Sequence, residues 1–76
     1  MIKIYADFNN CDEHGAVRLN GVGSLIDVEK YRGILAEGID VLLYMTDEFE
    51  VTGKLVIDDG VWKGVTNWET ICYSDS

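Results

Sequence analysis

The chain has 76 residues, with 14 acidic against 6 basic side chains and a formal net charge of −8. This length fits one small core, so we expect residues 1–76 to form a single domain. No apolar run approaches the ~20 residues of a membrane-spanning helix, and the cations are scattered among acids, which argues against a phosphate-binding stripe. Charged residues interrupt the first segment, so no signal peptide fits there. We therefore expect a cytoplasmic protein without a membrane or nucleic-acid partner.

The first predicted elements are two short strands. Residues 3–8 alternate, with Ile4, Ala6 and Phe8 on one side, which is the period of a strand. A polar loop over residues 9–15 follows. A second strand is predicted over 16–20, with Val17 and Leu19 facing one way.

Residues 24–32 are the one helical candidate. Ser24 is a favourable N-cap, and Gly33 suits the left-handed position that closes a helix. One apolar stripe is expected along this helix, formed by Leu25, Val28 and Tyr31.

The densest β segment follows. Strands are predicted over residues 39–45, 49–57 and 61–66, and residues 68–73 form either a sixth short strand or a helical turn followed by one. In the first hairpin, a Thr46-Asp47-Glu48 loop pairs Met45 with Phe49. The same register places Asp40 opposite Lys54, a complementary cross-strand pair.

The second hairpin allows two registers. With a three-residue loop over 58–60, Ile57 opposes Val61, and one face holds Phe49, Val51, Leu55, Ile57, Val61 and Val65. A two-residue Asp59-Gly60 loop instead turns Trp62 inward and exposes Val61 and Val65. The first register is preferred because it exposes fewer aliphatic side chains.

Five or six short strands and one short helix predict a mainly β protein, a small, strongly curved barrel of SH3-like or OB-like type. Residues 38–44, 50–55 and 61–62 resemble the hairpin series of SH3-like barrels. Residues 3–10 and 17–20 resemble a group of short bacterial proteins of unassigned function. Neither resemblance implies a functional residue, and the aromatic set with which eukaryotic SH3 domains bind polyproline is not evident.

The second face of the predicted sheet is aromatic. The preferred register places Tyr44, Glu50 and Trp68 in one cross-strand row, Leu42 beside Thr52, and Val56 beside Trp62. Either the closing barrel, the N-terminal strand or the helix covers these residues, or they form an exposed patch ringed by acids. Such a patch suits a peptide or a cationic side chain. The candidate binding residues are Tyr44, Trp62, Trp68, Leu42 and Val56.

One cluster carries metal-type ligands. Cys11 and His14 could supply two zinc ligands and Cys72 a third, but no recurring knuckle spacing accompanies them. The pattern therefore predicts an ordinary polar loop, with no metal and no cofactor. His14 is the sole histidine and nothing in the sequence orients it, so a catalytic site is not expected.

These patterns lead to three hypotheses of function. The first is a non-enzymatic binding or accessory module that acts through the aromatic face. The alternative is an acidic inhibitor or nucleic-acid mimic that docks on a basic partner protein. The third is self-association through the fourth strand, which has no proline to blunt an edge.

Overall fold

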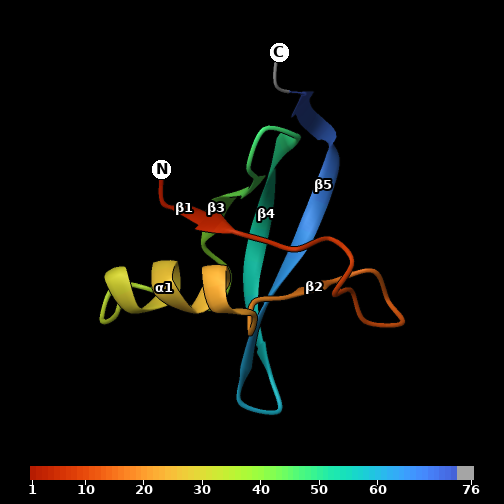
Figure 1. Ribbon diagram of the computed structural model, residues 1–76. Helices are drawn as coiled ribbons and strands as arrows, with labels where there is room; N and C mark the ends of the chain where they lie inside the picture. The colour runs from red at the N-terminus through yellow and green to blue at the C-terminus, as the bar shows by residue number, and fades with distance from the viewer. Residues whose placement is uncertain (74–76) are drawn as a thin grey trace.

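The fold is a strongly curved five-stranded half-barrel sheet with one short helix, seen in a computed structural model that describes residues 1–73 (Figure 1). Three consecutive strands, β3 (Asp40–Met45), β4 (Phe49–Asp58) and β5 (Val61–Tyr73), form an antiparallel meander. The short strands β1 (Lys3–Tyr5) and β2 (Val17–Arg18) flank it in the order β1-β3-β4-β5-β2. The prediction of a mainly β, strongly curved fold with one short helix is confirmed. No helix within residues 1–73 is long and apolar enough to cross a membrane.

The core lies on the concave face of this sheet. Its fully buried side chains are aliphatic, and they come from four strands and the segments that follow β1 and β2: Ile4, Ala6, Val17, Leu19, Val41, Leu43, Val51 and Leu55. Leu43 fills the space that Gly53 and Gly64 leave open. A Cβ at Gly53 would lie 2.9 Å from Leu43 Cδ1, and one at Gly64 would lie 2.6 Å from it. The two glycines therefore let the meander close around one leucine.

The first hairpin has the predicted register. Met45 pairs with Phe49 and Asp40 with Lys54, and the Lys54 ammonium lies 3.0 Å from the Asp40 carboxylate. Leu42 lies opposite Thr52, also as predicted. The complementary pair and the loop length together were enough to specify this part of the sheet.

The preferred register of the second hairpin is wrong. Ile57 pairs with Trp62, so the loop is the two-residue Asp59-Gly60 turn, with φ of 54° and 78°. Two successive positive φ values are typical of the type I′ turn, whose twist matches the flanking strands. As the alternative register requires, Val65 is exposed while Trp62 packs against the core. The preference for hiding aliphatic side chains was overridden by the turn.

Four further predictions about these strands are wrong. Val56 lies opposite Lys63 rather than Trp62, and Glu50 lies opposite Cys72, so Trp68 is not in a row with Tyr44 and Glu50. No separate sixth strand exists in the described chain, because residues 68–73 belong to β5: residues 68–71 form a bulge, after which Cys72 and Tyr73 pair again with β4. Nor is the fourth strand an edge, since β4 is paired on both sides.

The bulge is held by a side chain. The register shifts between Glu50 and Thr52, and there the Thr52 amide donates to Thr70 Oγ1 at 2.9 Å. The two threonine hydroxyls are 2.8 Å apart, and the Thr70 hydroxyl donates to the Asn67 carbonyl. The Thr70 hydroxyl thus accepts the hydrogen bond that the Thr52 amide would otherwise donate to the backbone of β5, which the extra residues of the bulge displace.

The helix α1 (Val22–Lys30) begins two residues before the predicted start. Ser24 is not its N-cap: Gly21 holds that position, and the Ser24 hydroxyl donates to the Tyr5 carbonyl of β1. Gly33 has the expected positive φ, at 93°. The predicted stripe is partly wrong, because Val28 and Tyr31 are half-buried whereas Leu25 is exposed.

Candidate functional site

Four aromatic rings meet at the end of the half-barrel where β5 finishes. Phe49 of β4 is the centre, with ring centroids 4.9 Å from Phe8, 5.9 Å from Trp68 and 6.1 Å from Tyr73. Phe8 and Trp68 also touch, at 5.4 Å. We call Phe8, Phe49, Trp68 and Tyr73 the aromatic patch.

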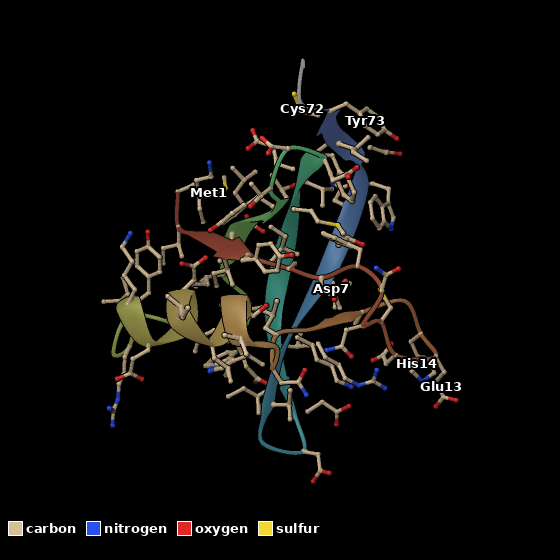
Figure 2. The ribbon with its side chains drawn as sticks, in the orientation of Figure 1. Met1, Asp7, Glu13, His14, Cys72 and Tyr73 are labelled. Atoms are coloured by element: carbon tan, nitrogen blue, oxygen red, sulfur yellow. The ribbon has the colours of Figure 1, made fainter. Side chains whose placement is uncertain are left out.

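The patch is half core and half surface. Phe8 and Phe49 pack against the buried cluster, whereas Trp68 is 48% exposed and Tyr73 is 69% exposed. Figure 2 shows Tyr73 at the upper end of β5, beyond the body of the sheet. The inner rings fix the place of the outer ones, and the outer ones present apolar area to solvent.

The residues around the patch in the chain are acidic. Asp47 and Glu48 form the exposed tip of the hairpin that leads into Phe49, and Asp47 has a φ of 61°. Exposed Glu69 follows Trp68, and Asp7 precedes Phe8. Lys3 lies 3.7 Å from the carboxylate of Glu50, the residue after Phe49. This end of the molecule therefore combines exposed rings with an excess of negative charge.

Tyr44 belongs to a different contact. Its hydroxyl donates to the Asp27 carboxylate of α1 at 2.8 Å, and its ring meets the Tyr5 ring edge-on at 5.7 Å. The hydrogen bond to Asp27, followed by burial, raises the pKa of Tyr44 above its usual value. Lys3 Nζ lies 5.3 Å from the Tyr44 ring centroid. The side chain is thus half-buried and occupied in holding the helix.

The other predicted binding residues lie apart from one another. Trp62 packs against the core at the Asp59-Gly60 end of the β4–β5 hairpin, while Trp68 lies toward the other end of β5. Leu42 is half-buried between Lys3 and Thr52 of the neighbouring strands. Within residues 1–73 no ring contact joins Tyr44 or Trp62 to Trp68. Of the five, Trp68 alone belongs to the aromatic patch.

Val56 lines a shallow groove on the convex face of the meander. The groove encloses about 340 Å³, and its walls include Asp40, Lys54, Val65 and Asn67. Its two charged groups are the ion pair of the first hairpin. The floor of the groove is apolar, and its two charged groups neutralise each other. The groove therefore offers few polar groups that could orient a ligand.

The Cys11–His14 loop does not assemble a metal site. Cys11 Sγ donates to the Phe8 carbonyl, and burial together with Asp12 raises the pKa of its thiol. His14 lies at the outer tip of the loop, and Cys72 at the far end of β5 (Figure 2). The described part of the chain contains no group of three metal-type ligands. The His14 imidazole lies 3.6 Å from the Glu13 carboxylate, and both side chains are exposed.

The same loop supplies a buried ion pair that ties β5 down. The Lys63 ammonium lies 3.0 Å from Asp12 and 2.7 Å from Asp58, and the Asp12 carboxylate also accepts from the amides of His14 and Ala16. The Lys63 bond, assisted by these amides, lowers the pKa of Asp12 to about 2. The two carboxylates in turn raise the pKa of Lys63. These groups are mutually satisfied, so the cluster is structural.

Sequence reasoning missed three members of the aromatic patch, Phe8, Phe49 and Tyr73. The sequence predicts Phe8 and Phe49 on the core face, where they do pack, but not their contacts with the exposed rings. The usable signal was the run Asn67 to Ile71, where apolar and polar residues stop alternating. A break of that kind indicates a bulge, and a bulge turns one side chain away from its strand's regular face.

Comparison with protein-family models, curated proteins and solved structures yields no match. The resemblance to SH3-like barrels and to short bacterial proteins therefore stays a prediction.

Proposed function

We propose that this protein is a non-enzymatic binding module whose aromatic patch takes a basic segment, rich in lysine or arginine, of a partner protein. The observation that carries the proposal is the exposure of Trp68 and Tyr73 on rings that are fixed from below by Phe8 and Phe49. Rigid, half-exposed aromatic side chains are the residue types that most often anchor protein interfaces.

The charge around the patch selects the partner. A guanidinium or ammonium group over an aromatic face gains ring-quadrupole attraction, about 0.5–1 kcal/mol when exposed and about 2 or more when desolvated. The acids at positions 47, 48 and 69 add attraction for the same cation and raise the rate of encounter. An acidic partner would meet repulsion at the same place.

The alternative hypothesis, mimicry of nucleic acid, has weaker support. Many of the acids that could form a phosphate-like ridge are engaged within the protein and lie on different elements. Asp40 pairs with Lys54, and Asp12 and Asp58 pair with Lys63. A binding site that uses aromatic rings as well as acids therefore accounts for more of the surface than charge alone.

Titration of Trp68 fluorescence tests the proposal. With Trp62→Phe, Trp68 becomes the sole tryptophan, and short arginine- or lysine-containing peptides are added alongside matched peptides with glutamine in place of each cation. We expect the basic peptides to change the emission and the glutamine peptides to leave it unchanged.

Two variants separate ring contact from plain charge attraction. Trp68→Ala should weaken binding measured by calorimetry about tenfold, whereas Asp59→Asn at the opposite hairpin tip should change it little. At about 1 M salt, where exposed charges are screened, residual binding should still depend on Trp68. If the Trp68→Ala chain and the parent bind the peptide with equal affinity, the proposal is contradicted. If Trp68→Ala and Asp59→Asn weaken binding to the same extent, the result favours charge mimicry.

A further inference from the structure

The helix α1 presents an apolar stripe to solvent. Val22 is 81% exposed, Leu25 51% and Ile26 64%. Their spacing of i, i+3 and i+4 places them on one face of the helix. Figure 1 shows α1 projecting sideways from the sheet. We call Val22, Leu25 and Ile26 the helix stripe.

The helix cannot rotate to hide the stripe. Gly23 lies against Tyr5, since a Cβ at position 23 would be 2.8 Å from Tyr5 Cδ1. The Ser24 hydroxyl donates to the Tyr5 carbonyl, and the Asp27 carboxylate accepts from the Tyr5 amide at 2.8 Å. These contacts, together with Val28 packed against the core, fix the opposite face inward. The apolar face is left without a partner among residues 1–73, which is unusual for a surface helix.

We propose that the helix stripe packs antiparallel, about a two-fold axis, against the same stripe of a second copy of this chain. Closed two-fold pairs are the commonest way in which soluble chains self-associate. Such a pair needs a face where two molecules of net charge −8 can approach. Around α1 the exposed charges are Glu29, Lys30 and Arg32, so the local balance is not acidic.

The ends of the helix are complementary in this arrangement. An axis between Leu25 and Ile26 places Glu29 of each copy opposite Val22 of the other. The N-terminus of α1 has no side-chain cap and no acid in its first turn. Its free amides and the positive end of its dipole therefore favour a carboxylate from outside. Glu29 is exposed, with a pairing to Arg32 at 3.2 Å that two exposed side chains can easily rearrange.

The contact is small, so the dimer should be weak. Three side chains and one carboxylate per copy fall below the size of a standard interface, and interfaces of that class are transient. We expect dissociation constants of roughly 10–100 µM. The stripe does not include any residue of the aromatic patch, so the pairing leaves the proposed peptide site free and does not depend on it.

Sedimentation equilibrium on the 76-residue chain tests the pairing across a concentration series that spans this range. The apparent mass should rise from 8.5 kDa toward twice that value. Leu25→Asp should stay monomeric. Val65→Asp adds the same charge at an exposed aliphatic residue of β5, 49% against 51% exposed, and should dimerise like the parent. Added salt should strengthen the parent dimer by screening its net charge.

The Glu29→Gln variant tests the contact between the Glu29 carboxylate of one copy and the N-terminus of α1 in the other. We expect this variant to weaken association severalfold. A parent chain that stays monomeric throughout the series overturns the proposal, as does equal weakening by Leu25→Asp and Val65→Asp. The other occupant to test is a lipid surface, by co-sedimentation with phosphatidylserine vesicles. A chain that stays monomeric and binds these vesicles through the helix stripe also overturns the proposed dimer. None of these results bears on peptide binding by Trp68.

Discussion

The central meander and helix α1 are built on opposite principles. The meander turns aliphatic side chains inward, so that Val41, Leu43, Val51 and Leu55 are fully buried. The helix does the reverse, with Ser24 only 1% exposed while Ile26 is 64% exposed. Apolar burial holds the meander, whereas hydrogen bonds to β1 and β3, with Val28 alone packed on the core from the helix, hold α1.

This difference separates stability from position. Burial of aliphatic area is the larger and less directional contribution to folding. Hydrogen bonds contribute less in net terms, but they determine which face of an element looks inward. The sheet therefore carries the stability of the molecule, and the polar contacts of α1 determine what its surface offers to partners.

The largest effect is expected from a change in the core of the meander. Leu43→Ala removes the side chain that fills the space between Gly53 and Gly64, where no neighbouring Cβ can compensate. It should lower the free energy of unfolding by about 3–5 kcal/mol, read from the urea midpoint. Leu42→Ala, one residue away and half-buried, is the control and should cost less than half as much. Similar losses would mean that the convex face is also core.

A smaller loss is expected when the helix anchor is removed. Asp27→Ala leaves the Tyr5 amide and the Tyr44 hydroxyl without their common acceptor, and should cost about 1–3 kcal/mol. Amide exchange should rise in α1 and stay protected in β3 to β5. Uniform loss of protection would show that helix and sheet unfold as one unit.

Acid should weaken the ionic contact at the base of β5. Because the pKa of Asp12 is lowered from 3.8 to about 2, the folded state binds this proton less readily than the unfolded state. Its contribution to stability is complete above pH 4 and is lost as pH falls from 4 to 2. In the Asp12→Asn variant, the urea midpoint should depend less on pH in that window. In the Asp59→Asn variant, the dependence of the midpoint on pH should be the same as in the parent.

Base should weaken the helix contact. The pKa of Tyr44 is raised because its hydroxyl donates to Asp27, so the folded state holds this proton more tightly than the unfolded state. The stabilisation is complete below pH 10 and is lost as pH rises through and above 10. Tyr44→Phe should remove that part of the alkaline loss, measured by circular dichroism, and Tyr73→Phe should not.

The smallest effect is expected on the outer face of α1. Ile26→Ser should change the monomer's stability by no more than about 0.5 kcal/mol, since the side chain is already mostly in water. Val28→Ala, on the inward face, should cost more. The two midpoints, measured in dilute solution where the chain is monomeric, compare the faces directly.

Local chemistry was enough to predict much of the sheet. Alternation identified the strands, and the loop Thr46-Asp47-Glu48 with the Asp40–Lys54 pair fixed the first register. The predicted second register is wrong because it rests only on the number of exposed aliphatic residues. The actual register is stabilised by a turn with two positive φ values and by Lys63, whose acceptor Asp12 lies 51 residues away.

The helix and the site show the same limit. Ser24 has the chemistry of an N-cap, but its hydroxyl bonds to Tyr5, 19 residues earlier. The aromatic patch combines Phe8 from the N-terminal segment with rings from β4 and β5. Sequence patterns indicate which residues are aromatic, whereas the bulge at Thr70 and the path of residues 6–10 decide which of them meet.

The order of the strands in the sheet also determines when each strand can find its partner during synthesis. β1 pairs with β3 and β2 pairs with β5. Ile4 therefore cannot pair before Leu43 has been synthesised, nor Val17 before Gly64. A nascent chain emerges with its N-terminal strands first, yet these have no partner until the meander has been made. Until β5 leaves the ribosome, Val17 and Leu19 lack their backbone partners Gly64 and Trp62. Completion of the fold is therefore a late, cooperative event, as non-local pairing requires.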